Sequence, residues 1–224
     1  MSFVDKKEVK CLCGEIFSAK VFLSVNLVHT PELKDVILEG RFNVVKCPKC
    51  KNFIYVEVPF FYLDAQESMV VYVYPKNYEE EKEKYLKEAD ANFALSMRMV
   101  EDTENKHDKY FLQVFFGIEE LVKFLTFQEK ENDEKDFLDK IVGGLNLKTI
   151  NFSSKESRQK NIISKLPYVD KGGRVSLENI IEGLSLVLKN YPQLEIYKRL
   201  LNDIKFNNII RENLLKLLEE QEDL

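Results

Sequence analysis

The alternation of apolar and polar residues predicts a chain that begins mainly with strands and continues mainly with helices. A strand shows strict alternation, or a continuous apolar run where both of its faces are buried. By these criteria the expected strands cover residues 17–25, 41–46, 53–58, 69–74 and 110–116. The first part of the chain is therefore β-rich.

Helical spacing of apolar residues marks the other segments. Within the β-rich part, Thr30 is expected to cap a short helix, Pro31 suits its first position, and Gly40 fits its end. The longer expected helices cover residues 78–100, 118–125, 137–142, 177–188, 194–204 and 209–218. Between them, the apolar segments 147–152 and 162–169 can pair as a small β element.

A run of polar and charged residues suggests where two domains meet. Residues 129–136 contain no apolar side chain. We interpret the run as the boundary between a first domain, residues 1–130, and a mainly α-helical second domain, residues 131–224. A solvated turn of helix would have the same composition, so that alternative stays open. A length of 224 residues accommodates two modest domains.

Composition and charge narrow the class of protein. Hydrophobic residues make up 45% of the chain and charged residues 32%, which favours a globular protein over a disordered or fibrous one. Residues 1–130 hold 18 Lys and Arg against 22 Asp and Glu, and residues 131–224 hold 15 against 16. Neither part is basic, so nucleic acid is an improbable partner.

The start of the chain is charged where a signal peptide would need an apolar core, and no apolar run reaches the roughly 18 residues that span a bilayer. We therefore expect no membrane association and a cytoplasmic location. Thiols stay reduced in that compartment, so metal binding becomes the leading interpretation of the cysteines.

All cysteines of the chain lie in two short pairs, Cys11 with Cys13 and Cys47 with Cys50. A structural Zn²⁺ site takes four soft ligands in a tetrahedron, and two turns that each offer two thiolates supply them. The second pair has the usual C-x-x-C spacing. The first is one residue shorter, and Gly14 after it provides the backbone freedom of a tight turn. The sequence predicts one structural Zn²⁺ held by these four cysteines.

Two other interpretations of the cysteines remain: a redox-active dithiol formed by Cys11 and Cys13, and four unrelated buried thiols. Four lysines flank the pairs, namely Lys10, Lys46, Lys49 and Lys51. They suit a phosphate-binding patch, but they also relieve the net negative charge of a metal bound by four thiolates. The acidic surroundings favour the second role.

We find no catalytic constellation in the sequence, and we expect no catalytic residue. The two histidines, His29 and His107, are expected in polar loops without a catalytic partner. Glu119 and Glu120 fit a helix start, where negative charge is favourable. Gly172 and Gly173 can form an anion-binding nest, but a hairpin or helix-entry turn is the commoner role of such a pair. Phosphate-binding, dinucleotide, metalloprotease and nucleophile-elbow motifs are absent.

Residues 8–75 resemble the CpXC domain of bacterial and archaeal proteins. The likeness is carried by KCLCGEIF, by SVNLVHTPELKDVILEGRFNVVKCPKC and by FIYVEVPFFYLDAQESMVVYVYP. The matching positions are Cys11, Cys13 and Gly14, then Asn26, then Pro31, Glu32 and Leu33, then Gly40, then Cys47, Pro48 and Cys50, then Tyr62 and Asp64, and finally Pro75. The likeness weakens up to Phe127 and is absent beyond it.

Two positions depart from the family pattern. Lys51 follows the second cysteine pair where the family commonly has glycine, and Leu63 stands where histidine is often found. The resemblance sharpens the expected fold and leaves function open, because the family is functionally uncharacterised.

The sequence thus predicts an α+β protein, with a zinc-ribbon-like antiparallel β domain, packed helices and a mainly helical C-terminal region. The function we expect is that of a cytoplasmic, zinc-stabilised binding protein whose partner is a protein. The alternatives are a nucleic-acid-associated zinc ribbon regulator and a thiol redox sensor that uses the C-x-C pair.

Overall fold

The structure is a computed structural model, and it describes residues 2–98 and 110–220. The chain forms two compact units, Met1–Thr126 and Phe127–Leu224. Helix α4 (Ile118–Ile141) contains the whole charged run 129–136, which is therefore helical, and the expected helices at 118–125 and 137–142 are parts of this one helix.

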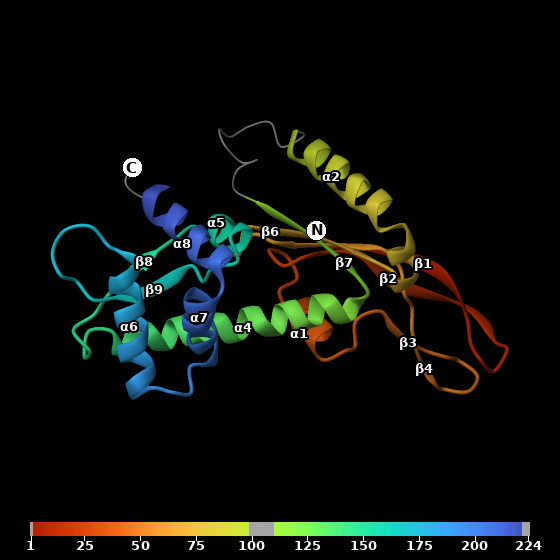
Figure 1. The fold of residues 1–224 in the computed structure, drawn as a ribbon. Helices are drawn as coiled ribbons and strands as arrows, with labels where there is room; N and C mark the ends of the chain where they lie inside the picture. Colours follow the sequence, from red (N-terminus) through yellow and green to blue (C-terminus); the bar gives the residue numbers. More distant parts are fainter. Residues whose placement is uncertain (1, 99–109, 221–224) are drawn as a thin grey trace. The chain divides into compact units, whose positions relative to one another are not determined.

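A five-stranded sheet in the order β1-β2-β5-β6-β7 forms the centre of the first unit (Figure 1). Its strands are β1 (Phe3–Lys10), β2 (Ile16–Asn26), β5 (Phe60–Asp64), β6 (Met69–Tyr74) and β7 (Phe111–Phe116). The pairs β1–β2 and β5–β6 are antiparallel, whereas β2–β5 and β6–β7 are parallel. The α+β class is confirmed, with a mixed sheet in place of a purely antiparallel one.

Both faces of strand β6 are buried, as its continuous apolar run predicts. Met69, Val71 and Val73 pack against helix α1 (Leu33–Leu38) and the first turns of α4, in a cluster that includes Ile37 and Leu121. On the opposite face, an aromatic cluster of Tyr72, Tyr74, Tyr78, Tyr85 and Phe116 packs with Ala89. Helix α2 (Lys82–Arg98) supplies Tyr85 and Ala89, and the 3-10 helix η1 (Lys76–Glu81) supplies Tyr78.

A separate two-stranded arm projects from this unit. It consists of β3 (Val44–Lys46) and β4 (Phe53–Tyr55), which pair antiparallel and are shorter than the strands expected at 41–46 and 53–58. Asn43, at the base of the arm, accepts a hydrogen bond from the Phe22 backbone N–H at 2.7 Å and donates one to its carbonyl at 3.0 Å. This amide side chain thus ties the arm to β2.

Three expectations about the first unit need correction. Thr30 does not cap α1, because its hydroxyl donates to the Asn26 carbonyl at 3.0 Å and the cap position is Glu32, which makes no side-chain capping bond. Strand β1 was not expected, whereas β5 is the strand ending at Asp64 that the family pattern implies. The helix expected at 78–100 begins as a 3-10 turn, and its last two residues lie outside the described part of the chain. Gly40 does end α1, with a φ of 68°.

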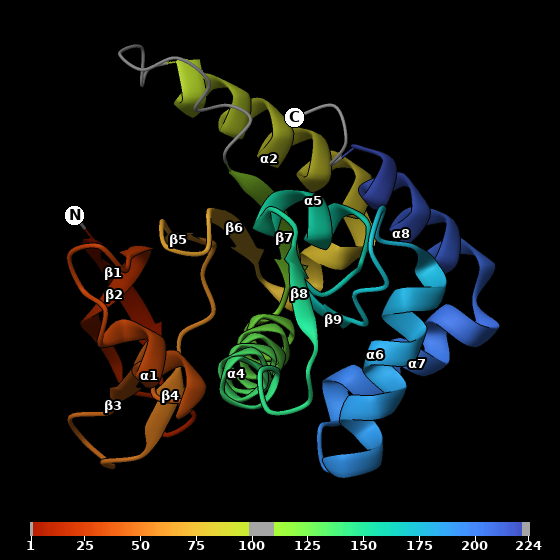
Figure 2. The ribbon, with the colours of Figure 1, turned by 90° about the vertical axis from the view of Figure 1, so that its left-hand side faces the viewer.

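The second unit combines the expected small β element with helices (Figure 2). Strands β8 (Lys148–Asn151) and β9 (Lys165–Tyr168) pair antiparallel, with the short helix α5 (Ser154–Gln159), which was not expected, between them. Three helices follow: α6 (Leu177–Asn190), α7 (Glu195–Phe206) and α8 (Asn208–Glu220). These agree with the apolar periodicity of the sequence.

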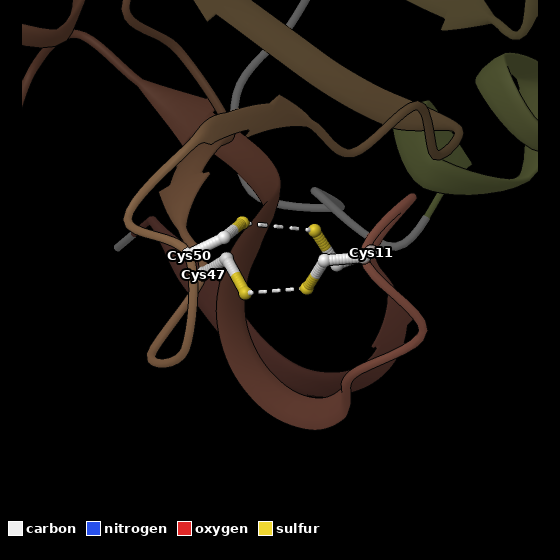
Figure 3. A group of neighbouring side chains, drawn as sticks. Cys11, Cys47 and Cys50 are labelled. Carbon is white, nitrogen blue, oxygen red and sulfur yellow. Dashed lines mark hydrogen bonds between the residues drawn. The ribbon is translucent and has the colours of Figure 1, made fainter.

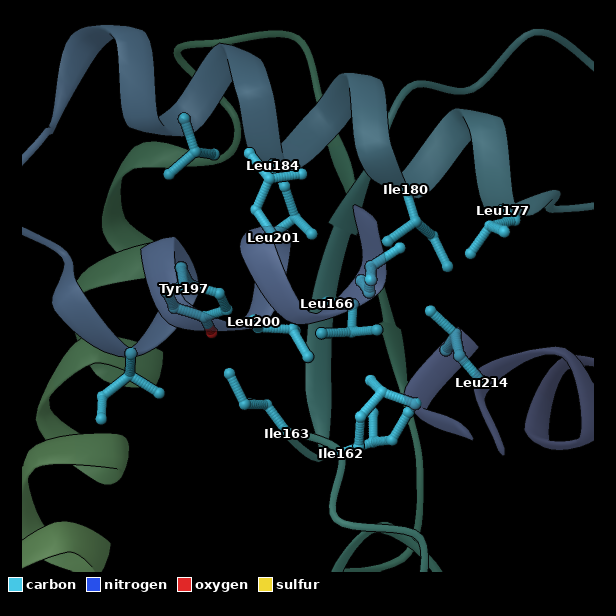
Figure 4. Packing of buried hydrophobic residues seen from close by; sticks show 14 of the residues in the cluster. Ile162, Ile163, Leu166, Leu177, Ile180, Leu184, Tyr197, Leu200, Leu201 and Leu214 are labelled. Carbon is cyan, nitrogen blue, oxygen red and sulfur yellow. The ribbon is translucent and has the colours of Figure 1, made fainter. Parts of the chain in front are cut away.

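A single apolar cluster holds the second unit together (Figure 4). Leu166 of β9, Leu184 of α6 and Tyr197 of α7 are fully buried in it, and Leu214 of α8 closes it. Across the residues that the structure describes, no helix is both long and apolar enough to cross a membrane.

Candidate metal centre

Two tight turns present the four cysteines. The first joins β1 to β2, and within it the Gly14 N–H donates to the Cys11 carbonyl at 2.9 Å while the Cys11 N–H donates to the Glu15 carbonyl at 2.8 Å. Gly14 has a φ of 85°, the left-handed conformation that glycine adopts without steric cost. Cys11 and Cys13 therefore project from one compact turn.

The second turn joins β3 to β4 at the tip of the arm. The Cys47 N–H donates to the Asn52 carbonyl at 2.9 Å, and the Lys51 N–H donates to the Cys47 carbonyl at 3.1 Å. Lys51 has a φ of 65°. It thus adopts the left-handed conformation for which the family commonly uses glycine, and the turn keeps its tight shape.

The turns bring all four sulfur atoms within 4.8 Å of one another (Figure 3). The Sγ atoms of Cys11 and Cys50 are 3.5 Å apart, and those of Cys13 and Cys47 are 3.7 Å apart. In a tetrahedral site with metal–sulfur bonds of about 2.3 Å, neighbouring sulfurs lie about 3.8 Å apart. The four cysteines are therefore close enough to bind one metal ion, and their donor atoms and spacing fit Zn²⁺.

The thiols differ in burial and in acidity. Cys11 and Cys47 are buried, Cys50 is half-buried and Cys13 is exposed. Burial opposes ionisation of Cys47, but the backbone N–H groups of Cys50 and Lys49 stabilise its thiolate, and together with the thiols of Cys50 and Cys11 they lower its pKa to about 6.

Cys11 behaves in the opposite way. The backbone N–H of Cys13 favours its thiolate, yet burial and the thiols of Cys13, Cys50 and Cys47 outweigh it and raise the pKa of Cys11 to about 12. A bound cation would favour the thiolate at each of these positions.

The flanking lysines have separate contacts. Lys49 lies 3.9 Å from the Glu15 carboxylate, and the Lys51 ammonium donates to the Pro48 carbonyl at 2.6 Å. The Lys46 ammonium lies 5.7 Å from the centre of the Phe53 ring. Lys10 is the strand partner of Ile16 at the end of the β1–β2 hairpin.

Other residues considered from the sequence lie elsewhere or have structural roles. His29 is exposed in the loop after β2, and His107 lies outside the described residues. The Glu120 carboxylate accepts a hydrogen bond from the Phe116 N–H at 3.0 Å, and so it ties the first turn of α4 to the end of β7. Gly172 and Gly173 form a turn with positive φ values of 78° and 86°.

Tyr62 and Asp64, two positions of the family pattern, have structural roles. Tyr62 is fully buried in the core of the first unit. The Asp64 carboxylate accepts hydrogen bonds from the Gln66 and Glu67 N–H groups, each at 3.1 Å, and thereby closes the connection from β5 to β6. Both residues support the five-stranded sheet at the end of β2 that lies away from the cysteine turns.

Sequence reasoning missed Asn43, the residue that positions the second turn. Asn43 is 7% exposed, and its backbone has a φ of 52°. Asparagine tolerates this backbone conformation better than most residues, which is the one local signal that marks the position. Its hydrogen-bond partner is 21 residues away and has no sequence signature.

These features define an α+β protein in which two turns bring four cysteines close enough to hold a metal ion. The chain belongs to the CpXC family, since the sequence pattern of the family described as CpXC protein matches residues 9–135, more than half of the chain. The match covers both cysteine turns, the five-stranded sheet from β2 onward and most of α4. No curated protein and no solved structure matches the chain.

Proposed function

We propose that Cys11, Cys13, Cys47 and Cys50 hold one structural Zn²⁺, and that the protein acts as a zinc-stabilised binding protein whose partner is a protein. The observation that carries this proposal is the convergence of four sulfur atoms within 4.8 Å. Four thiolates fill the tetrahedral coordination of Zn²⁺ and leave no position for a water or substrate, which is typical of a structural site.

The surroundings of the cysteines support a stabilising role. The metal would join the β1–β2 turn to the β3–β4 arm, in addition to the hydrogen bonds of Asn43 with Phe22 and the ion pair of Lys49 with Glu15. A staple of this kind holds a small β structure in one shape, and the free energy of metal binding becomes free energy of folding.

Exposed apolar side chains of the second unit support binding over catalysis. The helical second unit exposes apolar side chains near the junction of α7 and α8, where Phe206 is 85% and Ile209 69% exposed. Exposed apolar side chains that lie close together are typical of protein contacts. We propose the cytoplasm as the compartment, because thiolate sites persist where thiols are kept reduced.

Metal analysis combined with thermal melting tests the zinc assignment. Protein purified without added metal is expected to contain one Zn²⁺ per chain, and a strong chelator is expected to unfold the first unit. Cys47→Ser should lose the metal, because it removes the most acidic buried thiol. Asn52→Ser is the matched control, because Asn52 lies in the same turn and its side chain is exposed. This variant should keep the metal.

Two results would favour the alternatives. A zinc-free protein whose thiols oxidise and reduce reversibly would identify a redox sensor. Binding to DNA or RNA at low salt in a retardation assay, lost on substitution of the flanking lysines, would identify a nucleic-acid-associated ribbon.

A further inference from the structure

The end of the first unit that carries the cysteines exposes three large apolar side chains. Leu12 lies between Cys11 and Cys13 and is fully exposed, at 106% of its reference area. Phe53 is 73% and Ile16 55% exposed. Each lies within three residues of a cysteine, and because the four sulfurs converge within 4.8 Å, all three belong to the same tip of the molecule.

Lysines accompany two of these apolar residues across the strands. Ile16 pairs with Lys10 at the end of the β1–β2 hairpin, and Phe53 pairs with Lys46 at the end of the β3–β4 arm. Directly paired residues project from the same face of a hairpin, so each apolar side chain has an ammonium group beside it. For Phe53 the contact is direct, since Lys46 Nζ lies 5.7 Å from the ring centre.

The backbone at this tip is held in place. Hydrogen bonds close both turns, and a metal bound by the four sulfurs would fix them to each other. Side chains on a rigid backbone lose little further freedom when a partner binds, which raises affinity for a given contact area. Exposed leucine and phenylalanine on such a support are suited to act as anchors.

We propose that this tip, formed by Leu12, Ile16 and Phe53 with Lys10 and Lys46, is a docking surface for an acidic protein segment that also carries apolar side chains. This inference rests on the proposed zinc-stabilised binding function and names its partner class. The apolar side chains insert into the partner, and the lysines pair with its carboxylates. Electrostatic complementarity of this kind selects partners and speeds association.

The side chains favour a protein over a nucleic acid. Single-stranded nucleic acids are bound by rows of aromatic side chains and by arginine, whereas this tip has one aromatic ring and two aliphatic side chains.

Peptide selection on the intact, zinc-loaded protein tests the proposal. A displayed library of random dodecapeptides is panned on the wild type, and the enriched peptides are synthesised and their Kd values measured. We expect peptides of net negative charge that contain leucine, phenylalanine or similar residues. Binding should weaken when the salt concentration is raised, because the paired charges are exposed to solvent.

Three variants locate the binding surface. Leu12→Ser combined with Phe53→Ser should weaken binding of the enriched peptides by at least about tenfold, since exposed anchors carry most of the energy of an interface. Lys10→Gln combined with Lys46→Gln should weaken binding and reduce its salt dependence. Val28→Ser is the control, because Val28 is also apolar and 61% exposed but follows the opposite end of β2.

Zinc content and melting temperature are measured for every variant, which separates loss of docking from loss of the fold. Enriched peptides without negative charge, no enrichment at all, or affinities that the Leu12 and Phe53 changes leave unaltered would overturn the docking surface. If the docking surface is overturned but the protein still binds zinc and unfolds with chelator, the proposal of a zinc-stabilised fold remains valid.

Two further measurements test whether the tip binds a nucleic acid or a second copy of the chain instead. A single-stranded 20-mer oligonucleotide that binds through the lysines and is indifferent to Leu12→Ser would replace the proposed partner with nucleic acid. A wild-type dimer in sedimentation equilibrium that becomes a monomer on Leu12→Ser would replace it with a second copy of the chain. Each of these results contradicts the proposal.

Discussion

At the scale of single residues, the second cysteine turn depends on a lysine with a left-handed backbone. Lys51 has a φ of 65°, and in this region a residue with a Cβ is disfavoured by roughly 1–2 kcal/mol. Lys51→Gly and Lys51→Ala both lose the ammonium contact with Pro48, but glycine alone adopts the angle freely. We expect the glycine variant to exceed the alanine variant in unfolding free energy by about 1 kcal/mol.

Urea unfolding of the zinc-loaded variants measures this difference. The comparison is internal, because the lost lysine contacts are the same in both proteins and cancel. Equal stabilities for the glycine and alanine variants would show that the backbone of the turn carries no strain at Lys51.

Asn43 positions the arm through two hydrogen bonds to Phe22, at 2.7 and 3.0 Å. Asn43→Gly keeps the positive φ accessible and removes only the side chain. Each hydrogen bond contributes about 1 kcal/mol. The Phe22 N–H and carbonyl left without a partner are part-buried, so hydrogen bonds to water recover little of this loss. We expect a loss of about 2 kcal/mol in unfolding free energy and weaker zinc binding in a chelator competition.

Asn52→Gly is the matched control for this prediction, since Asn52 is exposed and its recorded hydrogen bond uses its backbone carbonyl. If Asn43→Gly bound zinc as tightly as the wild type, the amide bridge would be irrelevant to the placement of the second turn.

These residues show what sequence reasoning could and could not reach. The cysteine turns are local, and their spacing alone identifies the four candidate ligands. Asn43 and its partner are far apart in the chain, so no local pattern connects them. Thr30 illustrates the reverse case, because a good local capping residue is diverted by the nearby Asn26 carbonyl.

At the scale of elements, one buried carboxylate connects two helices of the second unit. Both carboxylate oxygens of Glu134, on α4, accept from the Ile196 N–H at 3.1 and 3.0 Å, and one accepts from the Tyr197 N–H at 3.3 Å. Leu194, at the cap position of α7, has no capping side chain. Glu134 therefore caps α7 from a distance of 62 residues along the chain.

Glu134→Ala should destabilise the second unit by about 2 kcal/mol, because it leaves helix N–H groups buried without an acceptor. Glu134→Gln keeps one acceptor oxygen and should recover part of that loss. Asp133→Ala, at the exposed neighbouring position, should change stability by less than about 0.5 kcal/mol. Urea unfolding followed by circular dichroism measures all three, and a neutral Glu134→Ala would refute the cap.

A close approach between helix and strand explains the glycine inside α6. A Cβ at Gly183 would lie 2.6 Å from the Pro167 carbonyl oxygen and 2.7 Å from the Tyr168 Cα, both backbone atoms of β9. In an open helix, alanine in place of glycine would add about 1 kcal/mol of stability. Here we expect Gly183→Ala to destabilise by about 2 kcal/mol, since α6 must move away from β9.

The control for this prediction is Gly143→Ala, where a Cβ would meet nothing within 4 Å. That change should be neutral or slightly stabilising. Thermal melting of both variants suffices, and a Gly183→Ala protein as stable as the wild type would mean that α6 and β9 pack less closely than the structure shows.

The elements that the sequence predicts correctly have either one solvent-exposed and one buried face or two buried faces. Helices α6, α7 and α8 and strands β2 and β6 belong to this group. Strand β1 was not predicted, because most of its residues are exposed and its alternation of apolar and polar residues is therefore weak. The charged run within α4 hid the continuity of that helix, and parallel pairing of β2 with β5 leaves no local trace.

At the scale of the whole molecule, the metal centre belongs to one unit only. All four cysteines lie within Met1–Thr126, and the apolar cluster of the second unit is formed by residues 138–218. The second cluster has fully buried members of its own, including Leu166 and Tyr197, and therefore its own source of stability. A metal held by the four cysteines would therefore stabilise the first unit, whereas the second unit has a core of its own.

Chelation should therefore unfold the molecule in part. Because structural zinc contributes its binding free energy to folding, removing it should release the amide protons of β1–β7 to exchange, whereas those of α6 and α7 should stay protected. Hydrogen exchange of the full chain, followed by mass spectrometry with and without chelator, measures both sets at once. Returning zinc should restore protection in the first set, which excludes irreversible damage as the cause. Simultaneous loss of protection in both units would show instead that they unfold as one cooperative structure, with the cysteines supporting the entire chain.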